Sequence, residues 1–172
     1  RRLLTSMVAP RILMVVTSQA TMGNTGAPTG LWLDELAVPY MRFADAGADV
    51  TVASIHGGKV PVDPRSTPPT GPEAPVVERF LADPTAARVL SHAVPIEALD
   101  ATRFDAVFLA GGHGTMFDFA VSNALASAHA QSAMTAHLAT VLKTMALDGR
   151  GVAWLPRSLI AEELAAARLV AA

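Results

Sequence analysis

The segment RILMVVTS at residues 11–18 is the sequence feature that most constrains the fold. Residues 12–16 are continuously apolar and rich in Val and Ile, without the alternation expected of a strand that has one face in water. This pattern predicts a strand buried on both faces. A glycine-rich turn (19–30) follows, and then apolar residues at helical spacing over 31–47. A buried strand followed by a helix is typical of a parallel sheet covered by helices on both sides.

The same alternation of strand and helix recurs along the chain. Further strands are predicted at ADVTVASI (48–55), FDAVFLA (104–110) and GVAWL (151–155), and further helices at 76–83, 84–92, 132–149 and 158–169. Gly47 suits the end of the first helix, whereas Pro39 should kink or restart it. Residues 56–75 are dense in Pro and Gly and predict a surface loop. The fold class is therefore α/β, with a mostly parallel sheet between helices.

Composition excludes several classes of protein. The 172 residues carry a formal charge of −2 and are 51% hydrophobic, so a well-buried core is expected and the basic surface of a nucleic-acid binder is missing. The longest apolar runs fall short of the roughly 20 residues that cross a bilayer. Residues 1–10 are predicted to be an N-terminal extension with a natural start at Met7, followed by one domain over 11–172. We expect a cytoplasmic protein that binds neither nucleic acid nor membrane.

The motif FLAGGHGTMFD at 108–118 lies where a ligand site is expected, because parallel sheets bind ligands beyond the carboxyl ends of their strands. Gly111 and Gly112 let the backbone turn sharply and direct N–H groups at a carbonyl oxygen or oxyanion. A tight turn without a ligand is the alternative. His113 is a candidate acid, base or pocket wall, or a histidine that is hydrogen-bonded to the backbone.

Glu35, at the start of the first predicted helix, is a candidate buried carboxyl group with a raised pKa. A solvated pair of charges, Asp34 and Glu35, is the alternative. GNTG at 23–26 is a weak phosphate-binding candidate. His129 and His137 are eight residues apart without a third ligand beside them, so we predict no metal site.

The chain has no cysteine. This excludes disulfide bonds, thiolate metal sites and cysteine nucleophiles within these 172 residues. The hydroxyl groups of Thr17, Ser18 and Ser158 are the remaining candidate nucleophiles, and the sequence places no base beside them.

Taken together, several motifs carry a family resemblance. The segments VVTS, GNTGAPTGLWLDELAVPY, FADAGADVTVASIHGGKVPVDPRS, FLADP and FDAVFLAGGHGTMFDF occur in order over about residues 11–119. They resemble the ThiJ/PfpI superfamily (the DJ-one lineage), and more narrowly its glyoxalase III-like and heat-shock chaperone-like branch. The resemblance implies a flavodoxin-like three-layer sandwich, related to class I glutamine amidotransferases.

The resemblance also implies a site. The family uses a cysteine on a strand-to-helix elbow followed by a histidine, a glutamate that bonds the thiol, and backbone amides that form an oxyanion pocket. It places Glu35 at the glutamate's position, Gly111 and Gly112 at the oxyanion turn, and His113 beside them. Implied activities are the cofactor-independent conversion of methylglyoxal to lactate, amidase, deglycase or protease activity, and chaperoning in a stress response. A homodimer, a small carbonyl substrate and unfolded-protein clients are implied as well, with no cofactor.

The C-terminal third departs from the family. If the strand 151–155 replaces the elbow strand, Pro156 and Arg157 stand where cysteine and histidine belong. Residues 142–170 resemble instead the end of a LysR-type regulator's effector-binding domain, which suggests a chimeric chain whose part from about 120 to 172 completes the sheet. We therefore expect a ThiJ/PfpI-like protein without catalysis. The alternatives are a small-molecule-binding module of LysR type, or a residually active amidase or hydrolase.

Overall fold

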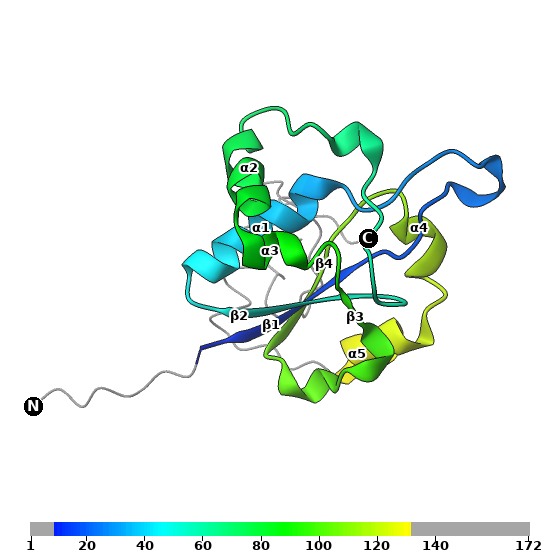
Figure 1. Cartoon of the computed structure of the whole chain (residues 1–172). Coiled ribbons are helices and arrows are strands. Elements are labelled where there is room, and N and C mark those ends of the chain that lie inside the picture. The colour runs from blue at the N-terminus through cyan, green and yellow to red at the C-terminus, as the bar shows by residue number, and fades with distance from the viewer. Residues whose placement is uncertain (1–8, 132–172) are drawn as a thin grey trace, which may run out of the picture.

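A computed structural model describes residues 9–131 of the chain (Figure 1). The helices and strands are β1 (Arg11–Val16), α1 (Leu33–Asp45), β2 (Asp49–Ser54), α2 (Ala74–Ala82), α3 (Pro84–Arg88), β3 (Val94–Pro95), β4 (Ala106–Leu109), α4 (Thr115–Asp118) and α5 (Asn123–Gln131). Short 3-10 turns lie at η1 (Gly23–Thr25), η2 (Pro64–Ser66), η3 (Ile96–Ala98) and η4 (Ala101–Arg103). The predictions made for residues 132–172, including the elbow and the LysR-like end, lie outside the described residues, as do residues 1–8.

The described strands form one parallel sheet in the order β3-β2-β1-β4. β1 pairs with β2 so that Val16 lies opposite Ser54, and with β4 so that Val15 lies opposite Leu109. The strands predicted at 11–18, 48–55 and 104–110 are confirmed, each within two residues at either end, and the strand predicted at 151–155 lies outside the described residues. Because all four strands run the same way, the loops that follow β1, β2 and β4 meet at one edge of the sheet.

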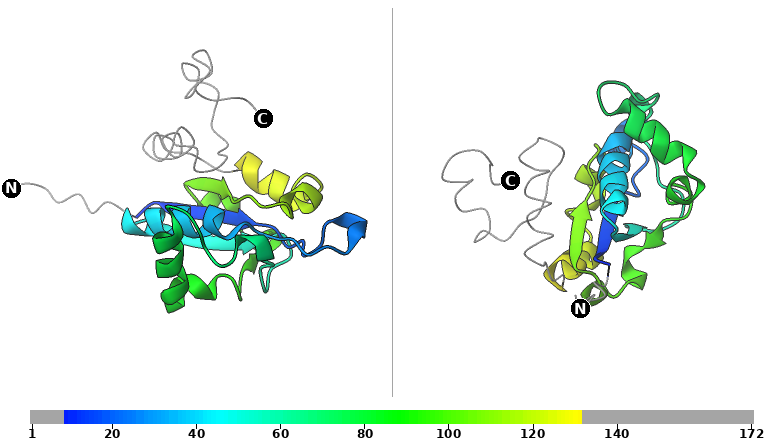
Figure 2. Two further views of the ribbon diagram at one scale, coloured as in Figure 1. Left: turned by 90° about the horizontal axis from the view of Figure 1, so that it is seen from above. Right: turned by 90° about the vertical axis from the view of Figure 1, so that its left-hand side faces the viewer.

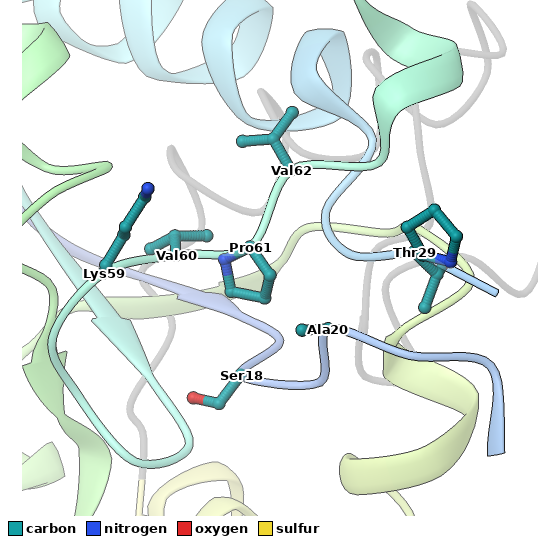
Figure 3. Close-up of a pocket in the computed structure, with 8 residues that line it drawn as sticks. Ser18, Ala20, Thr29, Lys59, Val60, Pro61 and Val62 are labelled. Atoms are coloured by element: carbon teal, nitrogen blue, oxygen red, sulfur yellow. The ribbon is translucent and has the colours of Figure 1, made fainter. Parts of the chain in front are cut away.

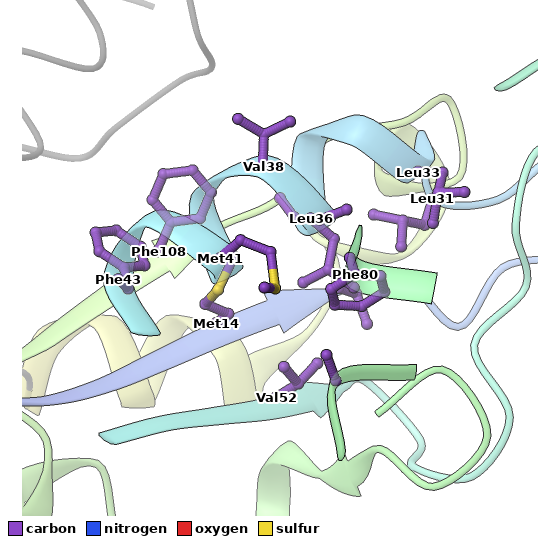
Figure 4. Close-up of a cluster of buried hydrophobic side chains, with 14 of the residues drawn as sticks. Met14, Leu31, Leu33, Leu36, Val38, Met41, Phe43, Val52, Phe80 and Phe108 are labelled. Carbon is purple, nitrogen blue, oxygen red and sulfur yellow. The ribbon is translucent and has the colours of Figure 1, made fainter. Parts of the chain in front are cut away.

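β1 is buried on both faces, as its apolar run predicts. Ile12, Met14 and Val16 face one core cluster, while Leu13 and Val15 face the other. The first cluster packs the sheet against α1, α2 and α3, and Figure 4 shows Met14, Leu36 and Phe80 among its members. The second packs the sheet against α5, η3 and η4.

The chain therefore has the three-layer arrangement of a flavodoxin-like fold, with helices on both faces of a parallel sheet. Figure 2 shows α2 and α5 on opposite sides of the strands. Edge-to-face aromatic contacts tighten the first core, with the rings of Phe43 and Phe108 5.7 Å apart. Within the described residues, no helix has both the length and the apolar character needed to cross a membrane.

Helix α1 continues through Pro39, which is a difference from the predicted restart. Proline has no N–H, so the carbonyl of Glu35 lacks its usual partner four residues later. Pro39 is buried, and packing against the core holds the helix together. The helix ends as predicted, because Gly47 adopts a φ of +82° and the N–H of Ala48 donates to the carbonyl of Phe43 at 3.0 Å.

The segment 56–75 is more ordered than the predicted surface loop. Val60 and Asp63 are buried, and η2 begins directly after Asp63. The sequence analysis did not predict three short elements, which are β3, α4 and α5. β3 has only two residues, and α4 only four, so neither shows a periodic pattern that a sequence window can detect.

Candidate active site

Three loops meet at the carboxyl edge of the sheet, and backbone hydrogen bonds join them. Residues 30–32, which lead into α1, lie in the middle. On one side, the N–H of Leu31 donates to the carbonyl of Pro61 at 2.8 Å, and the N–H of Asp63 donates to the carbonyl of Leu31. On the other side, the N–H of Trp32 donates to the carbonyl of Gly111 at 3.1 Å. Side chains from all three loops are thereby held close together.

The glycines of FLAGGHGTMFD are needed for this close approach. Gly112 has a φ of +133°, and a Cβ on it would overlap the carbonyl oxygen of Gly30 and stand 2.5 Å from the nitrogen of Trp32. A Cβ on Gly111 would overlap the carboxylate of Glu35. The double glycine therefore lets one backbone segment lie directly on another and on a carboxyl group.

Glu35 lies against this turn. Its side chain is half-buried, and burial is the main cause that raises its pKa above the ordinary value. The neighbouring charge of Asp34 raises the pKa further, whereas a hydrogen bond from the N–H of Gly111 opposes both effects. Glu35 is thus a carboxyl group biased toward holding its proton at the floor of a pocket.

The pocket beside Glu35 has a volume of about 400 Å³. Its lining consists of Trp32, Glu35, Gly112, His113 and Met116. The N–H of Gly111 donates a hydrogen bond to the carboxyl group of Glu35, so it is not directed at a ligand. The N–H groups of Gly112 and His113 find no acceptor among residues 9–131. Two successive unpaired amides next to a carboxyl group with a raised pKa suit a carbonyl or oxyanion oxygen.

An ion pair between the buried Asp63 and the half-exposed Arg65 lies beside this pocket. Asp63 is fully buried, and its carboxylate accepts from the Arg65 side chain at 2.9 Å (Nε) and 2.6 Å (Nη2), from the Arg65 N–H, and from the hydroxyl of Thr29 at 3.0 Å. The guanidinium group of Arg65 also lies 6.0 Å from the ring centre of Trp32 and 3.4 Å from Nδ1 of His113. The pair ties the loop after β2 to two residues that line the pocket.

The candidate hydroxyl nucleophiles are placed differently. Thr17 is fully buried, and its hydroxyl donates to the carboxylate of Asp118 at 2.8 Å. The hydroxyl of Ser18 accepts from the N–H of His56 at 2.9 Å. Neither residue lines the pocket beside Glu35, and the described residues that line it include no serine or threonine.

A second hollow of about 550 Å³ lies between the loop after β1 and residues 59–62 of the loop after β2 (Figure 3). Its lining consists of Ser18, Ala20, Pro28, Thr29, Lys59, Val60, Pro61 and Val62. This hollow is larger than the pocket beside Glu35, but its walls are mainly apolar and lack a carboxyl group or a histidine. We therefore take the smaller pocket as the candidate active site.

Three of the predicted site residues, Glu35, Gly112 and His113, line this one pocket, and Gly111 lies behind Glu35. Pro156 and Arg157 lie outside the described residues. GNTG forms η1 on the exposed surface. Within residues 9–131, no cluster of three His, Asp or Glu side chains could hold a metal ion.

Sequence reasoning missed Trp32, Met116 and the Asp63–Arg65 pair. The pair had a local signal, because Asp-Pro is a common turn opener and the Asp63 side chain caps η2 by accepting from the N–H of Arg65. That signal predicts a turn. It does not predict that the carboxylate is buried or that the arginine reaches a histidine 48 residues away.

Replacing Glu35 should change how stability depends on pH. The pKa of Glu35 is raised in the folded state, so its contribution is fully present below the unfolded-state pKa of about 4 and is lost as the pH rises through the folded-state value. We expect the free energy of unfolding of the unsubstituted protein, measured relative to Glu35→Gln, to fall over that interval in urea titrations. The matched control is Glu78→Gln on the exposed side of α2, which should show no such trend.

Comparisons with known proteins give structural neighbours. No known family profile matches the chain, and no curated protein does either. Rapid Encystment Protein 24 kDa (REP24) of Francisella tularensis is 35% identical over 69% of this chain, with a TM-score of 0.63. The protein APC35852 is 40% identical over 83% of this chain, with a TM-score of 0.54. Glyoxalase III of Candida albicans is 24% identical over 69% of this chain, with a TM-score of 0.58, which shows a shared fold. The chain spans only about half the length of these neighbours, 52%, 54% and 50% respectively.

Proposed function

We propose that this chain is a ThiJ/PfpI-type protein, related to glyoxalase III, whose pocket binds a small carbonyl compound without turning it over. The observation that carries the proposal is the position of Glu35, a half-buried carboxyl group with a raised pKa packed against the Gly111–Gly112 turn. The motifs of residues 11–119 and the neighbouring glyoxalase III fold support the family. The identity to REP24 agrees with this, because it extends over more than two thirds of the chain.

In this proposal, the residues of the pocket divide the work of holding a carbonyl group. The N–H groups of Gly112 and His113 donate to the carbonyl oxygen, which carries partial negative charge. In its protonated form, which burial favours, Glu35 donates to a second oxygen of the ligand, as a carboxylic acid does and a carboxylate cannot. Trp32 and Met116 provide apolar contacts for the carbon atoms of the ligand. Such an arrangement suits small, polar carbonyl compounds.

Turnover is a separate requirement. The family's reaction adds a thiolate to the aldehyde, and the 172 residues contain no cysteine. Thr17, the candidate nucleophile whose hydroxyl donates to the carboxylate of Asp118, is fully buried. The chain accordingly keeps the part of the site that stabilises an oxyanion and lacks the atom that creates one.

We expect no lactate above the buffer blank when the 172-residue protein is incubated with methylglyoxal and lactate is measured enzymatically. The physical reason is the missing thiolate, because preorganised donors alone do not form the new bond. Lactate production that disappears in Glu35→Ala but persists in Glu78→Ala would overturn the inactive assignment and locate catalysis in this pocket.

Three further expectations from the sequence analysis remain predictions. These are the homodimer, the chaperone activity on unfolded clients and the cytoplasmic location. The alternative of a LysR-type small-molecule module rests on residues 142–170, which lie outside the described residues.

A further inference from the structure

Arg65 stands between a buried carboxylate and a histidine of the candidate site. Its Nε and Nη2 donate to the two carboxylate oxygens of Asp63, and Nη2 also lies 3.4 Å from Nδ1 of His113. Arg65 comes from the loop after β2, whereas His113 follows β4, 48 residues further along the chain. Nothing in the proposed binding of a carbonyl group requires an arginine at this place.

We propose that Arg65 is a positioning residue that fixes the tautomer of His113, so that the imidazole offers an Nε2–H donor to the ligand of the pocket. The inference deepens the proposed function, on which its relevance to a ligand rests. It assigns to the pocket a third donor, beside the amides of Gly112 and His113. A pocket with several donors beside the carboxyl group of Glu35 suits ligands with two adjacent oxygen acceptors, such as small 2-oxo acids and 2-oxo aldehydes.

The donor and acceptor chemistry of the two side chains leads to this assignment. A guanidinium group has N–H donors only and accepts no hydrogen bond. The nitrogen that faces it, Nδ1 of His113, must therefore accept and cannot carry the proton. A neutral imidazole has one protonated and one unprotonated nitrogen, so the proton lies on Nε2. His113 is exposed at the mouth of the pocket, where Nε2 can reach a bound molecule.

The surroundings of Arg65 hold it in place for this role. Asp63 is fully buried and binds the guanidinium group through both oxygens, a geometry that fixes the plane of the group as well as its position. Thr29 donates to the same carboxylate and fixes it in turn. The ring of Trp32 lies 6.0 Å from the guanidinium carbon. Because these contacts already restrict the Arg65 side chain, little further conformational entropy is lost when Nη2 contacts His113.

The test is the tautomer of His113, observed by nitrogen NMR of the imidazole rings in the 15N-labelled full chain, with the signals assigned through His113→Gln. In the unsubstituted protein at a pH where the ring is neutral, we expect the signature of protonated Nε2 and unprotonated, hydrogen-bonded Nδ1. Arg65→Met removes the donor and keeps most of the side chain's bulk. In that variant we expect the Nδ1–H tautomer to increase about fivefold, the factor that one ordinary net hydrogen bond provides.

Arg79→Met is the matched control. Arg79 also pairs with an aspartate, Asp45, at 2.6 Å, but on the exposed outer side of α1 and α2. It should leave the His113 spectrum unchanged. Arg65→Lys keeps a cationic donor on a flexible chain and should restore part of the tautomer preference. A protonated Nδ1 in the unsubstituted protein would overturn the proposal, and so would an unchanged His113 spectrum in folded Arg65→Met.

Ligand binding is measured separately, so the two proposals can fail independently. The probe is pyruvate, followed by the fluorescence of Trp32 in a Trp154→Phe background. If the tautomer behaves as expected and pyruvate does not bind at millimolar concentration, the positioning role stands and the proposed function fails. If pyruvate binds, Arg65→Met should weaken binding about fivefold while Arg79→Met should not.

Discussion

Gly112→Ala is expected to lower the free energy of unfolding by about 3–5 kcal/mol, which is a large share of the stability of a small domain. The added Cβ would overlap the carbonyl oxygen of Gly30 and stand 2.5 Å from the backbone nitrogen of Trp32. Backbone atoms cannot swing aside as the end of a side chain can. Relief therefore requires the loop before α1 to move away from the loop after β4, which breaks the hydrogen bond between Trp32 and Gly111.

The measurement is the midpoint of urea unfolding, followed by circular dichroism. Gly26→Ala is the matched control, because Gly26 also has a positive φ (+71°) but has no atom within 4 Å of the position of a Cβ. That variant should cost only the backbone preference, about 1 kcal/mol. Equal losses in the two variants would show that the close approach of the two loops is not required for stability.

Asp63→Ala should destabilise the protein by about 2 kcal/mol. The substitution leaves the buried hydroxyl of Thr29 and the guanidinium group of Arg65 without their common acceptor. The loss is smaller than for a fully buried pair because Arg65 is half exposed and water can solvate it. In the control Asp45→Ala, which breaks the exposed pair with Arg79, the change should stay below about 0.5 kcal/mol.

The pH dependence of stability provides a second test of the role of the Asp63 carboxylate. Hydrogen bonds from the Arg65 side chain, with smaller contributions from the Arg65 N–H and Thr29, hold the pKa of Asp63 well below its usual range although burial acts in the opposite direction. A lowered pKa stabilises the folded state above the unfolded-state value of about 4, and this stabilisation is lost as the pH falls below it. The advantage of the unsubstituted protein over Asp63→Asn should therefore shrink between about pH 5 and pH 3. An advantage that stays constant would mean that Asp63 is not ionised in the folded state.

Much of the fold follows from the sequence. The apolar run of β1 and the alternation in β2 predict strands because side chains that must avoid water on both faces leave little other choice. α1 shows helical spacing and a glycine at its end, both of which the structure confirms. Of the kink or restart expected at Pro39, the restart does not occur, because packing against the core outweighs one missing hydrogen bond.

The candidate site follows from the sequence only in part. Glu35 and the glycines were predicted from their motifs, and the structure places Glu35, Gly112 and His113 around one pocket. The unpaired amides turned out to be those of Gly112 and His113, because the N–H of Gly111 donates to Glu35. Sequence spacing cannot decide this, since which amide faces a pocket depends on a rotation of the backbone at Gly112.

The sequence by itself determined the features that depend on local residues. These are the buried strands, a helix and its end, a turn that only glycine permits, and the absence of a thiol. Tertiary structure alone decided which groups meet. Asp63 and Arg65 lie on the loop after β2 and His113 lies on the loop after β4, and their contact depends on the parallel sheet that brings the ends of these strands to one edge. The physical reason is that burial and hydrogen bonding at this edge are properties of three converging backbones, and no single stretch of sequence contains them.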